Sequence, residues 1–64
     1  MEHAQYLTEI EVAAMTRRAV STLRNERYLR RGIPFIKIGR SVRYKTADVV
    51  LYMDQRRVDV NKSN

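Results

Sequence analysis

The chain has 64 residues, no cysteine, a single histidine and a net charge of +6. This length suits one small domain and excludes a large buried substrate cavity, and the lack of cysteine excludes disulfides and thiolate metal sites. No apolar run is long enough to cross a bilayer, and the acidic N-terminal segment is unlike a signal peptide. We therefore expect a cytoplasmic protein with no cofactor, no metal and no membrane partner.

The positive charge is confined to the middle of the chain. Residues 1–16 hold three acids and no Lys or Arg, residues 17–45 hold ten bases and one acid, and residues 46–64 are balanced. Such a block repels itself unless an anionic partner binds it. The pattern favours a nucleic-acid-binding surface over a solvated basic face that only aids solubility, because a solubility device need not be confined to one stretch.

A first helix is predicted over about residues 9–15. Thr8 can cap it, and Glu11 three positions later can return a hydrogen bond to the cap, which is the pattern of a capping box. Leu7 before the cap and Val12 at the fourth helical position can form a hydrophobic staple.

A second helix is predicted over about residues 17–29, with Thr16 as its cap. Val20, Leu23 and Arg27 share one side at helical spacing. The side away from Leu23 and Glu26 carries cations and short polar groups, a mixture that can read base edges, whereas cations alone would bind without specificity. The candidate DNA-contacting residues of this helix are Arg17, Arg18, Ser21, Thr22, Arg24 and Asn25. An ordinary exposed helix face is the alternative.

Two short strands follow, because Gly32 and Pro34 end the second helix and the next residues alternate in a β-rich pattern. We expect a three-residue loop over residues 39–41. In the expected register Ile38 faces Val42, Lys37 faces Arg43 and Ile36 faces Tyr44. The four apolar residues then line one buried face of the hairpin, and the two cations lie opposite each other on its solvent face. The candidate DNA-contacting residues of this hairpin are Lys37, Arg40, Arg43 and Lys45. Protection of an edge strand by charge is the alternative.

A third helix is predicted from a cap at Thr46 to about Val58, with Asp48 in its first turn. We expect residues 1–5 to be disordered and residues 59–64 to form a polar tail. Residues 6–58 then form one α+β domain, a winged helix-turn-helix with three helices and a two-stranded hairpin. The predicted core comprises Leu7, Val12, Val20, Leu23, Ile36, Ile38, Val42, Tyr44, Val49 and Met53.

An enzyme is not expected from this sequence. The carboxylates are scattered, and no nucleophile has a histidine base beside it because the only histidine is His3. Tyr44 has the chemistry of a recombinase nucleophile, but its place on the predicted apolar face of the hairpin indicates a core residue.

Several segments resemble the excisionase and AlpA-like family, which are small MerR-like winged helix-turn-helix proteins of phages and integrative elements. The resemblance covers about residues 6–56. It rests on Tyr6-Leu7-Thr8, Val12-Ala13-Ala14, Thr22-Leu23-Arg24-Asn25, Arg31-Gly32-Ile33-Pro34, Asp48-Val49 and above all the run Lys37-Ile38-Gly39-Arg40-Ser41-Val42-Arg43-Tyr44. The family pattern implies a helix in the major groove, here residues 18–25, and a hairpin wing on the backbone or the minor groove.

The chain departs from this family at two places. Many relatives carry a Val-Ser pair where this chain has Arg18-Ala19, and an aromatic residue where Glu26 stands. These departures leave the start and the local packing of the second helix open.

The expected function is sequence-specific binding of double-stranded DNA. The resemblance implies either an architectural factor in prophage excision, with an integrase or another copy of the chain as a partner on DNA, or a regulator of transcription. A protein-interaction module whose basic face docks an acidic partner is the alternative from another class. RNA binding is a third reading, which the lack of paired aromatic residues for stacking single strands disfavours.

Overall fold

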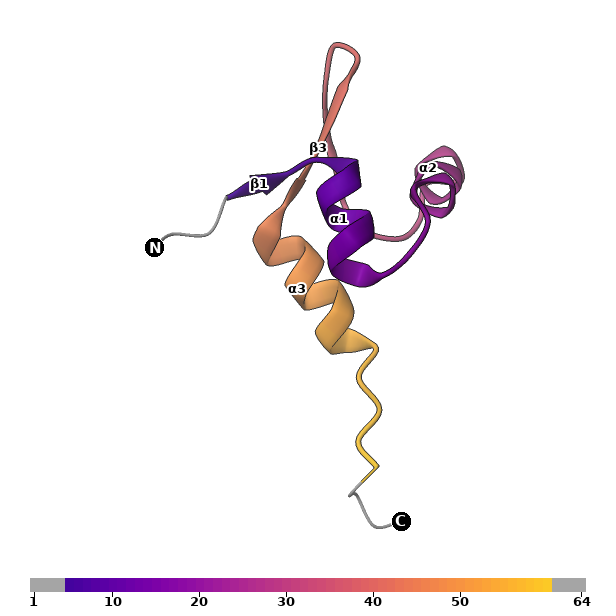
Figure 1. Ribbon diagram of the computed structural model, residues 1–64, viewed down its shortest axis with the longest axis vertical. Helices are drawn as coiled ribbons and strands as arrows, with labels where there is room; N and C mark the ends of the chain where they lie inside the picture. Colours follow the sequence, from indigo (N-terminus) through magenta and orange to yellow (C-terminus); the bar gives the residue numbers. More distant parts are fainter. Residues whose placement is uncertain (1–4, 61–64) are drawn as a thin grey trace.

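The computed structural model describes residues 5–60 and shows an α+β domain of three helices and a three-stranded antiparallel sheet (Figure 1). The elements are β1 (Tyr6–Leu7), α1 (Glu9–Thr16), α2 (Val20–Tyr28), β2 (Ile36–Ile38), β3 (Ser41–Lys45) and α3 (Thr46–Gln55). The β2–β3 hairpin, called the wing below, projects from one end of the molecule (Figure 1). The predicted fold class is confirmed, with one strand more than expected. The predictions for residues 1–4 and 61–64 lie outside the described part of the chain.

The additional strand is β1, which pairs with β3. Tyr6 lies opposite Lys45 and Leu7 opposite Tyr44, so β3 is the central strand of the order β1-β3-β2. The chain then turns directly into α1, where the predicted capping box is confirmed. The backbone N–H of Glu11 donates to the Thr8 hydroxyl at 3.1 Å, and the Thr8 N–H donates to the Glu11 carboxylate at 2.8 Å.

The turn between α1 and α2 is longer than predicted. Thr16 is still part of α1, where its hydroxyl donates to the Val12 carbonyl at 2.8 Å, so the prediction that it caps the second helix is wrong. Arg17 is left-handed (φ 56°) and its N–H closes the end of α1 on the Ala13 and Ala14 carbonyls. A residue used in this way cannot begin another helix, and α2 therefore starts at Val20 rather than at residue 17.

The wing has a different register from the predicted one. Ile36 pairs with Arg43, Lys37 with Val42 and Ile38 with Ser41, one residue away from the expected alignment. The loop is therefore two residues long, and Gly39 has φ +59°, as the first position of a type II′ turn requires. Lys37 and Arg43 consequently lie on opposite faces of the wing, and the prediction that they oppose each other is wrong.

The core lies between α1, α2, β3 and α3, and its membership differs in part from the prediction. Its buried residues are Val12, Ala13, Leu23, Ile33, Tyr44 and Val49, with Leu7, Val20, Val42 and Tyr52 packed against them. Ile36, Ile38 and Met53 are 39%, 65% and 42% exposed, so their assignment to the core is wrong. The two isoleucines are exposed because the wing extends beyond the body, where nothing in the described chain covers its outer face (Figure 1).

The third helix follows β3 without a loop. Its cap residue is Lys45, which makes no side-chain capping bond, so the predicted cap at Thr46 is wrong. The Thr46 N–H instead donates to the Gln5 carbonyl at 2.9 Å and ties the start of α3 to the chain before β1. The helix ends at Gln55, three residues before the predicted end, because the next two N–H groups bond three residues back and tighten the last turn.

Candidate nucleic-acid interface

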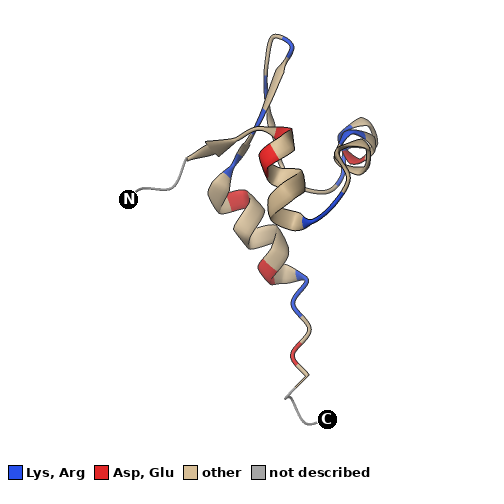
Figure 2. Ribbon diagram, in the orientation of Figure 1, with Lys and Arg blue, Asp and Glu red and all other residues tan. Residues whose placement is uncertain are grey.

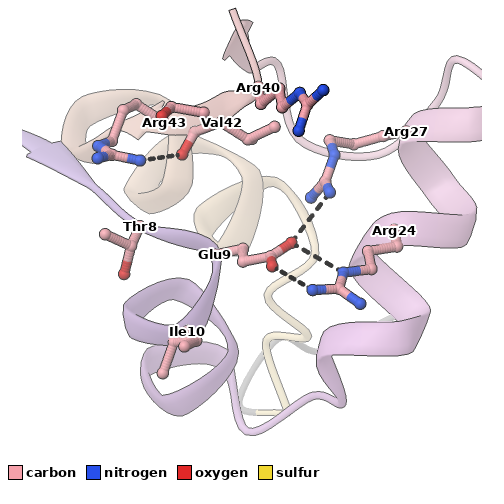
Figure 3. A pocket seen from close by; sticks show the side chains of 9 residues that line it. Thr8, Glu9, Ile10, Arg24, Arg27, Arg40, Val42 and Arg43 are labelled. Carbon is pink, nitrogen blue, oxygen red and sulfur yellow. Dashed lines mark hydrogen bonds and ion pairs between the residues drawn. The ribbon is translucent and has the colours of Figure 1, made fainter. Parts of the chain in front are cut away.

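A groove of about 560 Å³ lies between α2 and the wing. A second groove of about 380 Å³ adjoins it on the α1 side and shares Arg24, Arg27, Arg40 and Val42 with it (Figure 3). The residues that line the first groove are Arg24, Arg27, Tyr28, Arg30, Phe35, Lys37, Arg40 and Val42. Five of these eight are cations and none is an acid, so the groove is suited to an anion.

The exposed face of α2 presents one polar stripe. Ser21, Arg24, Asn25 and Tyr28 are all exposed and follow the spacing of neighbours on one helix face. Thr22 is also exposed, beside this stripe. The stripe begins at a helix end that has no side-chain cap and no acidic residue in its first turn, and the positive end of the helix dipole is thus available to a phosphate.

Arg18 does not belong to this stripe, contrary to prediction. Its guanidinium forms an ion pair with Glu26 and donates to the Tyr52 hydroxyl at 3.3 Å. It also lies 5.9 Å from the centre of the Tyr52 ring. The carboxylate of Glu26 raises the pKa of Arg18 further. Arg18, in the turn before α2, therefore links Glu26 of α2 to Tyr52 of α3 and is a structural cation.

Arg24 and Arg27 converge on one carboxylate, that of Glu9 at the start of α1 (Figure 3). Glu9 accepts two hydrogen bonds from Arg24, at 3.2 and 2.7 Å, and one from Arg27 at 2.9 Å. These bonds, led by those from Arg24, hold the pKa of Glu9 at about 2. We call these three residues the Glu9 clamp.

The two arginines of the clamp differ in exposure. The side chain of Arg27 is only 15% exposed, donates to the hydroxyl of buried Tyr44 at 2.7 Å, and lies over the rings of Phe35 and Tyr44. The side chain of Arg24 is 64% exposed. Arg27 is thus a structural link, as its predicted place on the inner side of the helix indicated, while Arg24 stays accessible to a ligand.

Several cations of the central basic stretch have no carboxylate partner among residues 5–60. Near α2 these are Arg17, Arg30 and Arg31, and on the wing they are Lys37, Arg40, Arg43 and Lys45. Figure 2 shows Lys and Arg, in blue, on both α2 and the wing. Arg17, Lys37 and Arg40 are thus placed as free, exposed cations. Arg40 reaches from the wing tip toward the Glu9 clamp (Figure 3).

The two remaining predicted residues lie on the other face of the wing. Arg43 points away from the clamp and donates to the Val42 carbonyl at 2.8 Å (Figure 3). Lys45 shares this outer face by strand alternation and is exposed. The structure thus brings Lys37 and Arg40 together with α2 and separates Arg43 and Lys45 from it.

Several residues that line the two grooves were not predicted as site residues, among them Arg30, Tyr28 and Glu9. Arg30 belongs to the basic stretch and its charge could have been used to find it. Tyr28 could have been found from its spacing, since residues 21, 24, 25 and 28 lie on one helical face. Glu9 gave no such signal, because an acid in the first turn of a helix is ordinary.

Other chemistry is sparse over residues 5–60. No group of three His, Cys, Asp or Glu side chains converges to hold a metal ion in this part of the chain. None of its helices combines the length and apolarity needed to cross a membrane. No family model, curated protein or solved structure matches the chain.

Proposed function

We propose that this protein binds double-stranded DNA, with α2 in the major groove and the wing against the backbone or the minor groove. The observation that carries the proposal is the basic groove between α2 and the wing, in which Arg30, Lys37 and Arg40 have no carboxylate partner among residues 5–60. A B-form major groove admits one α-helix, and the exposed stripe of α2 offers both an arginine and short polar groups to base edges. Arg30 follows α2, and Lys37 and Arg40 lie on the wing across the groove. These three cations supply positive charge to the neighbouring phosphates.

The division of labour between α2 and the wing follows from their side chains. Asn25 can pair with adenine and Arg24 with guanine, and Ser21 can accept or donate. Lys37 and Arg40 present charge, which fixes orientation on the duplex but carries no sequence information. We therefore assign base reading to α2 and anchoring to the wing.

The proposal includes a biological role. The resemblance of residues 37–44 to the excisionase and AlpA-like family supports either a DNA-bending excision factor or a small regulator of transcription, located at the nucleoid. A gel-phasing assay with the bound site separates the two, because a factor that acts architecturally must bend its DNA whereas a regulator needs only occupancy.

The test of DNA binding is competition binding against a randomised duplex library. Asn25→Ala should cost about 1–3 kcal/mol on the best site and little on random duplex, because it removes a base contact. Arg40→Ala should weaken both by similar factors. The matched control is Arg57→Ala, which removes one exposed charge outside the groove and should change binding less than Arg40→Ala.

Two outcomes would contradict the proposal. If the wild type shows no duplex binding in the presence of heparin, the basic groove serves an acidic protein partner instead. If Arg40→Ala changes the preferred sequence and Asn25→Ala does not, the wing is the reader and the assignment of roles is inverted.

A further inference from the structure

The Glu9 clamp places a carboxylate beside a groove in which five of the eight lining residues are cations. Glu9 has a side chain that is only 20% exposed, and both of its oxygens accept from arginines of α2. It belongs to a different element, since it is the first residue of α1. An acid at the edge of a phosphate-binding groove weakens attraction to any duplex, so that general affinity alone does not account for it.

The bonding pattern leaves one side of Arg24 free. A guanidinium has five N–H donors in a fixed planar fork. Glu9 uses the Nε donor and one donor of Nη2. The second Nη2 donor and both Nη1 donors remain, and they form the end-on edge that pairs with the O6 and N7 atoms of guanine. The residue is therefore held by one edge while the other is open.

Holding an arginine by one edge has two consequences. The side chain loses rotamer freedom before it meets a ligand, so less entropy is lost when a directional pair forms. The adjacent carboxylate also offsets its charge, which weakens its attraction to phosphates without changing its hydrogen-bonding geometry. Both effects favour base reading over non-specific attachment.

We infer that Glu9 is a specificity-determining residue of the DNA interface, which acts by positioning Arg24 for a base edge and by restraining its binding to phosphates. The inference rests on the proposed function, since it assumes that α2 meets a duplex. Glu9 itself is a positioning residue and need not touch the DNA. Arg27, held by the same carboxylate and by Tyr44, fixes the clamp to the core.

The experiment compares Glu9→Gln with a matched control, Glu11→Gln. Both variants remove one negative charge from α1, and Gln is compatible with the capping box in which Glu11 takes part. Dissociation constants are measured on the best library site and on random duplex, across a salt series. Glu9→Gln should bind random duplex more tightly, with a salt slope steeper by about 1, and its discrimination should fall on the order of tenfold. Glu11→Gln should leave the discrimination ratio unchanged.

A second background tests whether Glu9 acts through Arg24. In Arg24→Ala, the further change Glu9→Gln should no longer alter the discrimination ratio. If thermal melting shows that Glu9→Gln is unfolded, the variant Arg24→Lys tests instead whether the planar fork of Arg24 reads a base. Lysine keeps the charge but has no planar fork, so discrimination should fall while the salt slope stays constant.

The results separate this inference from the function on which it rests. A wild type that binds no duplex would overturn the proposed function and the inference together. A wild type that binds selectively, with the same selectivity in Glu9→Gln or in Arg24→Lys, would overturn the inference alone. An equal loss of selectivity from Glu9→Gln with and without Arg24 would also overturn it, because Glu9 would then act by another route.

Discussion

Arg27→Met should be the most damaging change that leaves the apolar core of this domain intact. Arg27 joins the start of α1 to β3 through Glu9 and Tyr44. Hydrogen bonds to charged groups contribute about 1.5–3 kcal/mol each, and an unpaired buried hydroxyl costs about 1–3 kcal/mol. Met preserves the packing of the stem over the rings, and removal of a desolvated charge offsets part of the loss. We expect a net destabilisation of about 2–3 kcal/mol.

This loss is large for a chain of this size. A domain with about 0.05–0.15 kcal/mol per residue has a total stability of roughly 3–10 kcal/mol, and each kcal/mol shifts Tm by about 4–8 °C. Urea denaturation followed by circular dichroism measures the change, with Arg31→Met as an exposed control that should stay within about 0.5 kcal/mol. In a Tyr44→Phe background the cost of Arg27→Met should fall by about 1 kcal/mol, because no hydroxyl is left unpaired. A cost below about 0.5 kcal/mol for Arg27→Met in the wild type would refute the buried link.

Glu9 has a pKa of about 2 in the folded chain against 4.5 for the free group, so the unfolded state binds more protons between these pH values. The free energy of unfolding of the wild type should exceed that of Glu9→Gln by about 1 kcal/mol after solvent screening. This difference should be present above about pH 5 and shrink as the pH falls toward 2, as urea titrations at several pH values would show. Gly32→Ala should destabilise more than Gly39→Ala in thermal melts, because both have positive φ but only a Cβ at Gly32 meets a neighbour, the carboxylate of Glu26 at 2.6 Å. The log-log slope of duplex affinity against salt should be about −4 to −5 if four to six phosphates are neutralised, and a slope near zero would contradict the electrostatic mode.

Local sequence rules predicted the helices and strands better than they predicted the register between the strands. The capping box of Thr8 and Glu11 is confirmed because both partners lie within one helical turn, so that no tertiary information is needed. The register of the wing was wrong for a related reason. A hydrophobic pattern fixes register only where the apolar face of a hairpin is buried. Val42 and Tyr44 lie on the face that packs against the core, whereas Ile36 and Ile38 lie on the opposite, exposed face. The two-residue turn at Gly39 therefore decides the alignment.

The positive charge of the candidate site could be predicted from the sequence, but the ion pairs that its arginines form could not. The basic stretch predicted that Lys37 and Arg40 would lie on the hairpin, since charge density is a property of sequence, and the structure adds that both line the groove beside α2. The loss of Arg18 to Glu26 and the restraint of Arg24 by Glu9 depend on contacts between residues 8 and 15 positions apart. The first contact depends on the turn before α2 and the second on how α2 packs against α1, and no periodicity in the sequence encodes either.

The two departures from the family pattern turn out to be one feature of the structure. Arg18 and Glu26 are the positions at which the sequence departs from the pattern that it resembles, and their two side chains form an ion pair. One oxygen of Glu26 accepts from Arg18, while the other is buried against Gly32 and has no hydrogen-bond partner among the described residues. Removal of Arg18 alone would leave this carboxylate without its counter-charge, which costs more than the pair contributes. Replacement of Arg18 alone by an apolar residue should therefore lower the stability of the fold more than replacement of both Arg18 and Glu26 by apolar residues.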